Sequence, residues 1–215
     1  MNFYQEVTVI ETPDISPYFI WGKLFTQVHL ALVEQKAPNN RVPFGVSFPE
    51  YKCFNDKGKA VKTLGRKLRV FAHTEQLLDQ LDLQKWLMRL TDYLHIKSVQ
   101  AVPSEVKSHV VVSRYQPVKN LERTTRRLAK RQGISFEEAL KQQNQRFAEL
   151  NGYSLKQAEE HYHNPVVKEF PFIKISSLSS GNNYSLHIVQ RAMAKECKGD
   201  FNTYGLSNGA TVPYW

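Results

Sequence analysis

The stretch NFYQEVTVIETPDISPYFIWGKLFTQVHLALVEQ, residues 2–35, decides how the first half of this chain folds. Residues 2–10 alternate in polarity and are rich in β-forming side chains, which predicts a strand. Pro13 and Pro17 end that pattern. Apolar side chains then recur at helical spacing over residues 18–35, which predicts an amphipathic helix with one apolar side made of Ile20, Leu24, Val28, Ala31 and Leu32.

The residues that follow repeat these strand and helix signals. Short strands are predicted over residues 41–51 and 67–72, and a helix is predicted over residues 74–94 with a break near Asp82. Residues 98–102 predict a closing strand. The resulting order, β-α-β-β-α-β, is typical of a ferredoxin-like domain, in which two helices cover one face of an antiparallel sheet.

A second domain is expected after a boundary near Pro103. Its predicted elements are a strand at 110–115, a helix at 119–132, a helix begun by a capping box of Ser135 and Glu138, and strands at 167–175 and 184–190. The expected fold class is therefore α+β. A ferredoxin-like domain is expected at 1–103, and a C-terminal α+β domain with an arginine-rich helix is expected at 104–215.

Composition and charge narrow the class of protein. The chain has 215 residues, and its 29 Lys and Arg against 20 Asp and Glu give a net charge of +9. No stretch reaches the roughly 18 apolar residues of a membrane span, and the first residues lack a signal peptide pattern. Two cysteines, Cys53 and Cys197, are too few for a disulfide framework. We therefore expect a cytoplasmic protein without membrane contact, and the charge favours a polyanionic partner.

Much of the positive charge lies in one predicted helix, KNLERTTRRLAKRQ at residues 119–132. On a helical wheel Leu121 and Leu128 form a narrow apolar seam, and the bases spread over the opposite side. Those bases are Lys119, Arg123, Arg126, Arg127, Lys130 and Arg131, with Glu122 as the single acid. A solvated helix usually interleaves acids with its bases, and arginine suits phosphate better than lysine does. The helix therefore favours nucleic acid as the partner.

Few residues suggest chemistry by themselves. His161 and His163 form an HxH pair, but no Cys or Asp nearby completes a set of ligands, so we expect neither a metal nor a cofactor. His29 lies beside Val28 at the border of the predicted first helix, where a histidine is more often a packing residue than a catalyst. If the polyanion is RNA, however, its own 2′-hydroxyl can attack the adjacent phosphate. A histidine base, a serine and a basic groove would then suffice.

Six segments, in their order and spacing, make the chain resemble the CRISPR RNA-processing endoribonucleases of the type I-F system. They are QVHLAL at 27–32, GVSFP at 45–49, SRYQ at 113–116, the basic helix with ER at 122–123 and RRL at 126–128, SLSSG at 177–181, and YGLS at 204–207 followed by VP at 212–213. The resemblance implies an enzyme that binds the repeat stem-loop of precursor CRISPR RNA and cuts the 3′ base of the hairpin without a metal. It also implies a 2′,3′-cyclic phosphate product, and retention of the RNA within the type I-F surveillance complex with its other subunits.

The resemblance further assigns roles to single residues. By position, the expected catalytic residues are a general base, a serine that holds the attacking ribose, and a tyrosine that positions the base: His29, Ser177 and Tyr204. The expected base-reading residues at the foot of the stem are Arg114 and Gln116, and Ser179 is expected near the scissile phosphate. Tyr184 stands where the family commonly has a phenylalanine under the terminal base pair.

The resemblance also places the arginine-rich helix in the major groove of the hairpin. Arg127 and Arg131 match arginines of that helix, and the neighbouring bases Arg123, Arg126 and Lys130 are expected to contact RNA with them. Two alternatives stay open from the residues alone. One is a structured-RNA-binding protein without catalysis, and the other is a protein that binds double-stranded DNA.

Overall fold

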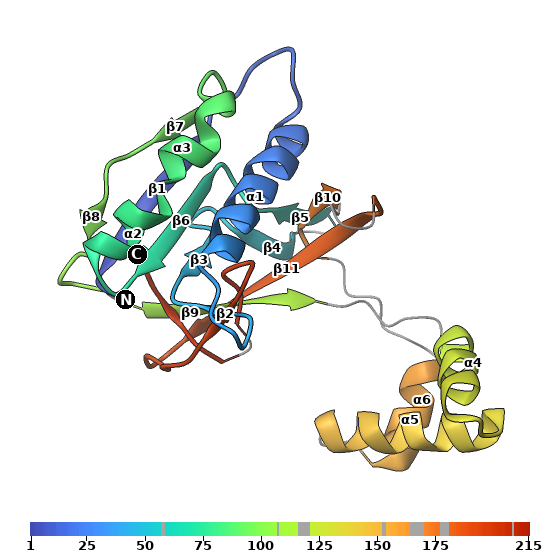
Figure 1. Ribbon diagram of the computed structural model, residues 1–215. Helices are drawn as coiled ribbons and strands as arrows, with labels where there is room; N and C mark the ends of the chain where they lie inside the picture. Colours follow the sequence, from blue (N-terminus) through green and yellow to red (C-terminus); the bar gives the residue numbers. More distant parts are fainter. Residues whose placement is uncertain are drawn as a thin grey trace. The chain divides into compact units, whose positions relative to one another are not determined.

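The computed structural model mixes helices and strands (Figure 1). It describes residues 1–56, 59–106, 108–115, 121–151, 154–163, 170–176, 181–207 and 209–215, with only the backbone described at 56, 150–151 and 161–163. The chain forms two compact units, one made of Met1–Tyr115 with Phe170–Trp215 and the other of Gln116–Glu169. This division differs from the boundary expected at 103/104, because residues 108–115 and 170–215 pack with the first unit.

The first sheet of the larger unit is built from the N-terminal half of the chain. Its strand order is β3-β6-β1-β7, all pairs are antiparallel, and β8 also pairs with β1. The strands are β1 (Phe3–Val9), β3 (Gly45–Ser47), β6 (Lys67–Ala72), β7 (Leu94–Ile96) and β8 (Gln100–Ala101). The strands predicted at 2–10 and 67–72 are therefore confirmed.

Helix α1 (Pro17–Glu34) confirms the helix predicted over 18–35. Pro17 opens the helix, where its fixed φ suits the first turn and its missing N–H costs nothing. The predicted apolar side is buried, together with Trp21 and Phe25, which also follow helical spacing. Because Val28 is fully buried, the neighbouring His29 lies at the edge of the buried face.

The helix predicted over 74–94 is shorter than expected. It is split into α2 (Glu75–Leu81) and α3 (Leu83–Leu87), and the predicted break is confirmed by Asp82, which adopts a left-handed conformation with φ of 46°. A short 3₁₀ turn (Met88–Leu90) follows. Leu94 was wrongly assigned to the helix, since it pairs with Val9 as the first residue of β7. Sheet pairing outweighs local helix propensity at that point.

The sequence pattern missed or misplaced several short strands. The segment predicted as one strand over 41–51 contains β2 (Arg41–Val42) and β3, and β2 pairs with β12 (Phe201–Asn202) rather than with β3. The hairpin of β4 (Lys52–Asp56) and β5 (Lys59–Thr63) was not predicted. None of the described side chains of the hairpin is fully buried, and strands without a buried face give a weak periodic signal.

A second antiparallel sheet lies in the same unit, with the order β10-β11-β9-β13. Its strands are β9 (Ser108–Tyr115), β10 (Phe172–Ser176), β11 (Asn183–Met193) and β13 (Val212–Tyr214). Strand β10 passes directly over α1, because a Cβ atom at Gly22 would lie only 2.7 Å from the carbonyl oxygen of Lys174. Glycine at this position therefore allows the edge of the sheet to reach the helix that carries His29.

The smaller unit contains α4 (Leu121–Gln132), α5 (Phe136–Asn151) and α6 (Leu155–His163). The predicted capping box of α5 is confirmed: the Ser135 N–H donates to Glu138 Oε2 at 3.1 Å, and the Glu138 N–H donates to Ser135 Oγ at 3.1 Å. Gly133, with φ of 67°, follows α4 and lets the chain turn into α5.

Helix α4 docks on α5 through a hydroxyl as well as through apolar side chains. Leu121 and Leu128 are half-buried, and Thr125 between them is fully buried. The Thr125 hydroxyl lies 2.8 Å from the Leu121 carbonyl oxygen and 3.0 Å from Gln143 Oε1. The predicted seam therefore exists, with Thr125 at its centre.

Candidate active site

His29 lies on α1 with its ring held by a backbone carbonyl. The ring is half-buried, and Nδ1 lies 2.7 Å from the carbonyl oxygen of Thr203. A carbonyl oxygen can only accept, so Nδ1 must carry the hydrogen of this bond. In the neutral ring, Nε2 then keeps its lone pair and can accept a proton.

Tyr204 holds the plane of the His29 ring. The two ring centroids lie 3.9 Å apart and the rings are inclined by only 5°. The Tyr204 ring also lies nearly parallel to the buried ring of Phe25, at a centroid distance of 6.4 Å. The Tyr204 N–H also donates to Asn202 Oδ1 at 2.9 Å, which anchors the turn that carries both Thr203 and Tyr204. The imidazole therefore has one preferred orientation before any substrate arrives.

Burial sets the protonation of both rings. Desolvation lowers the pKa of His29, and the bond to the Thr203 carbonyl only partly opposes that shift. The imidazole is therefore neutral over a wider range of pH than a free histidine. Desolvation and the hydrogen bond between the Tyr204 and Tyr184 hydroxyls raise the pKa of Tyr204, so its hydroxyl stays protonated near neutral pH.

Tyr184 extends this cluster to the second sheet. It lies on β11 opposite Ile175 of β10, and its hydroxyl oxygen is 2.5 Å from that of Tyr204. The guanidinium of Arg114, on β9, lies 5.7 Å from the centre of the Tyr184 ring. Arg114 is exposed, so its N–H groups are accessible to a ligand. The sequence suggested a stacking ring at position 184, and the structure adds a hydroxyl contact to the tyrosine beside His29.

The structure thus brings four predicted site residues together in one cluster: His29, Tyr204, Tyr184 and Arg114. Gln116, Ser177 and Ser179 lie outside the described residues. Thr203 was not among the residues predicted from the sequence, and its contribution is a backbone carbonyl. A backbone atom leaves no signature in residue type, so no sequence signal could have identified it.

The bases of the predicted arginine-rich helix belong to the smaller unit. All five that lie in α4 are exposed: Arg123, Arg126, Arg127, Lys130 and Arg131. Arg126 also pairs with Glu122 one turn earlier, at 2.6 Å. Lys119, the sixth base of the predicted helix, lies outside the described residues. The described part of α4 therefore presents a basic surface, as its sequence predicted.

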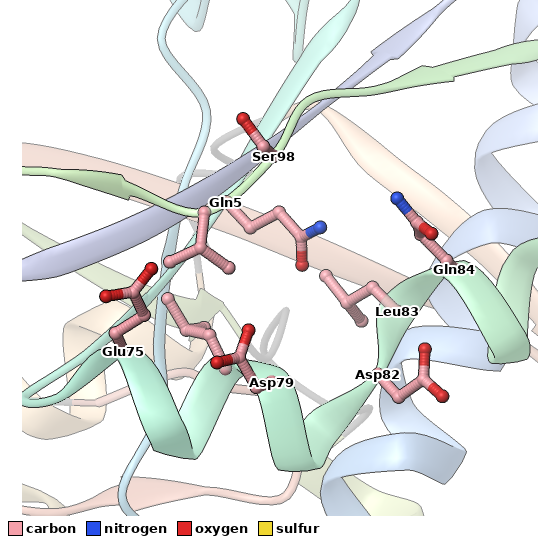
Figure 2. Close-up of a pocket in the computed structure, with 9 residues that line it drawn as sticks. Gln5, Glu75, Asp79, Asp82, Leu83, Gln84 and Ser98 are labelled. Atoms are coloured by element: carbon pink, nitrogen blue, oxygen red, sulfur yellow. The ribbon is translucent and has the colours of Figure 1, made fainter.

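A pocket of about 330 Å³ lies elsewhere on the larger unit (Figure 2). Figure 2 shows Glu75 and Asp79 on α2 and Asp82 after it, around the side chain of Gln5. Three carboxylates make this pocket unfavourable for a polyanion. It contains none of the predicted site residues.

Within the described part of the chain, no three His, Cys, Asp or Glu side chains gather closely enough to hold a metal ion, and the side chains of His161 and His163 lie outside it. None of the described helices is long and apolar enough to span a membrane.

The Tyr204 contacts can be tested separately. We expect Tyr204→Phe to preserve the stacked ring and to lower any His29-dependent rate by less than about 10-fold. Tyr204→Ala removes the ring that orients the imidazole, so it should lower the rate by about 100-fold, which is the usual cost of a misplaced reacting group. Single-turnover rates of the two variants decide this. Equal losses in both variants would show that the hydroxyl, and not the stacked ring, carries the effect.

Comparisons with known proteins agree along the whole chain. A family model described as CRISPR-associated protein (Cas_Csy4) matches residues 4–215. A protein of Escherichia coli (strain UTI89 / UPEC) named CRISPR-associated endonuclease Cas6/Csy4 is 32% identical over 216 residues, covering 100% of both chains. A protein of the same name from Pseudomonas aeruginosa (strain UCBPP-PA14) is 30% identical over 216 residues, again covering 100% of both.

Two solved structures also align along nearly all of the chain. One is titled "An RAMP protein binding different RNA substrates", with a TM-score of 0.33, 13% identity, and coverage of 99% of each chain. The other is titled "CRISPR associated protein Cas6", with a TM-score of 0.32, 11% identity, and coverage of 100% of this chain and 99% of the other. These scores are too low to relate the folds in detail.

Proposed function

Because the chain belongs to the Cas6/Csy4 family of CRISPR-associated endonucleases, we propose that it is a metal-independent endoribonuclease that processes precursor CRISPR RNA. Its substrate is the repeat stem-loop, and the cut falls at the 3′ base of the hairpin. The observation that carries this proposal is the fixed imidazole of His29, with Nδ1 bonded to the Thr203 carbonyl oxygen and Nε2 left as an acceptor.

The proposed reaction needs a base, an aligned ribose and positive charge. Nε2 of His29 takes the proton of the 2′-hydroxyl at the cut, and the 2′-oxygen forms a bond to the adjacent phosphorus. The bond from phosphorus to the 5′-oxygen breaks, and that oxygen takes up a proton. The products are a 2′,3′-cyclic phosphate and a 5′-hydroxyl. The lowering of the His29 pKa by burial supports this role, since a base must be unprotonated when the substrate binds.

The other site residues complete the proposal. Tyr204 positions the imidazole, Ser177 holds the attacking ribose, and Ser179 lies near the scissile phosphate. Arg114 and Gln116 read base edges at the foot of the stem, and the contact between Arg114 and Tyr184 supports a location close to His29. Tyr184 lies under the terminal base pair, where its ring face stacks.

The proposal also covers the fold of the N-terminal half and the way helix α4 binds the hairpin. Within the larger unit, residues 1–103 form a ferredoxin-like arrangement, which the order β3-β6-β1-β7 with α1 and α2 supports. Helix α4 enters the major groove of the hairpin, and the exposure of its bases supports this. That groove is normally too deep for side chains, but a short stem with an open loop end is easier to enter. After cleavage the protein stays on the hairpin and joins the type I-F surveillance complex.

Incubation of the purified protein with end-labelled repeat RNA in excess EDTA tests the activity. We expect one cut at the 3′ base of the stem, and mass spectrometry of the fragments should show a 2′,3′-cyclic phosphate and a 5′-hydroxyl. Tight binding without any cut would favour the non-catalytic RNA-binding alternative. Equal affinity for the stem-loop and for a DNA duplex at matched salt would favour the DNA-binding alternative.

A further inference from the structure

A row of ring side chains crosses the second sheet on the face opposite Tyr184. Phe172 of β10 pairs in register with His187 of β11, and His187 pairs with Tyr115 of β9. The Phe172 and His187 ring centroids lie 5.3 Å apart, and those of Tyr115 and Phe170 lie 4.8 Å apart. Because side chains alternate along a strand, His187 and Tyr184 point to opposite faces of β11. We call Phe172, His187, Tyr115 and Phe170 the aromatic row.

The aromatic row is accessible on the larger unit. Phe172 is 39% exposed, and the other three rings are half-buried. An exposed phenylalanine in a sheet face that is also lined by other rings is a surface on which a flat ligand can stack. The row is also close to the candidate active site along the strands, because Tyr115 follows Arg114 and His187 is three residues, or about 10 Å, from Tyr184.

The charge around the aromatic row selects the kind of ligand. Strands β9, β10 and β11 contain no Asp or Glu, while they carry Arg114, Lys174 and Arg191. Lys174 is exposed and lies on the same face as Phe172, two residues further along β10. The three strands therefore combine flat rings with a positive side chain and contain no carboxylate. Such a surface favours a single-stranded nucleic acid, which has planar bases and an anionic backbone.

We propose that the aromatic row stacks bases of the unpaired RNA that leaves the foot of the stem-loop. This inference rests on the proposed function, which places that foot at His29. Bases inside the stem already stack on their neighbours, so only unpaired nucleotides can offer a free ring face to Phe172. Lys174 would then contact the backbone of the same strand.

Binding measurements with three RNAs test this proposal. One is the bare stem-loop, one carries an unpaired 5′ extension, and one carries an unpaired 3′ extension, each with 2′-deoxyribose at the cut so that it stays whole. We expect the wild-type protein to bind at least one extended RNA more tightly than the bare stem-loop. Phe172→Ala should weaken binding of that RNA by about 10-fold and leave the bare stem-loop unchanged. Phe172→Tyr should retain the full affinity, because it keeps the ring.

A matched control is Phe54→Ala, which removes a phenylalanine that is 53% exposed on β4. It should bind all three RNAs as the wild type does. The proposal is overturned if Phe172→Ala weakens the bare stem-loop and the extended RNA equally, or if it weakens neither. Unchanged affinity for the bare stem-loop also shows that the variant is folded. A wild-type protein that fails to bind the bare stem-loop would instead overturn the proposed function itself.

Discussion

His29→Ala is expected to cleave the repeat stem-loop about 10²- to 10⁴-fold more slowly than the wild type, which is the usual contribution of a general base. Its affinity for the same RNA should change little. The His29 ring is half-buried under Tyr204 and its Nδ1 is occupied by the Thr203 carbonyl, so it offers the RNA only one polar atom. Single-turnover cleavage and equilibrium binding, measured on one protein preparation, separate the two effects.

The control for this variant is another histidine of the same unit. His95 is exposed on β7 and is not part of the cluster around Tyr204, so His95→Ala should cleave at the wild-type rate. A stem-loop with 2′-deoxyribose at the cut should bind the wild type and stay whole, since it lacks the attacking group. Unchanged cleavage by His29→Ala would show that another group is the base.

The same residue predicts the pH dependence of cleavage. The neutral imidazole is the active form, so acidification through the His29 pKa removes the base and lowers the rate. Because burial lowers that pKa below the ordinary value of about 6.5, the rate at about pH 6.5 should exceed half of its maximum and should fall through half only in more acidic solution. Rate measurements between about pH 4.5 and 8 check this. A rate that already falls by half near neutral pH would contradict a lowered pKa.

The parts of the fold that depend on neighbouring residues were readable from the sequence. The capping box of Ser135 and Glu138, the break at Asp82 and the apolar side of α1 each follow from residues within a few positions of one another. The β4–β5 hairpin was missed, since neither strand alternates regularly between apolar and polar side chains. Leu94 was misplaced because its partner Val9 lies far away in the sequence, and local patterns do not contain that contact.

The identities of the residues in the candidate site could also be predicted, whereas the contacts between them could not. The resemblance identified His29, Tyr204 and Tyr184, but no pattern shows that Nδ1 faces the carbonyl of Thr203, 174 positions further along the chain. That contact decides which nitrogen can act as a base. The Tyr184–Tyr204 hydroxyl pair is equally hidden, because the resemblance concerns a ring at position 184 and the family commonly has no hydroxyl there. The resemblance therefore identified the residues of the site, and the long-range contacts show which atoms of those residues donate and accept.

Replacing Arg127 and Arg131 together by alanine is expected to weaken stem-loop binding by about 100-fold at low salt, since a hydrogen bond to a charged group contributes roughly 1.5 kcal/mol. Both side chains are exposed on α4, and their spacing of four residues puts them on the same side of the helix. Two lost phosphate contacts should also reduce the slope of log affinity against log salt by about 1.5 to 2. Titrations of the stem-loop at several salt concentrations measure both quantities.

The double variant Lys85→Ala, Arg89→Ala supplies the matched control, because it removes two exposed positive charges four residues apart in the larger unit, outside α4. Its net charge equals that of the α4 variant. If the overall charge of +9 governs binding, the two variants should lose affinity equally. If α4 holds the phosphates, only the α4 variant should lose affinity and salt dependence. Equal losses would therefore show that the arginine-rich helix contributes only to the overall charge, and they would contradict its proposed position in the major groove.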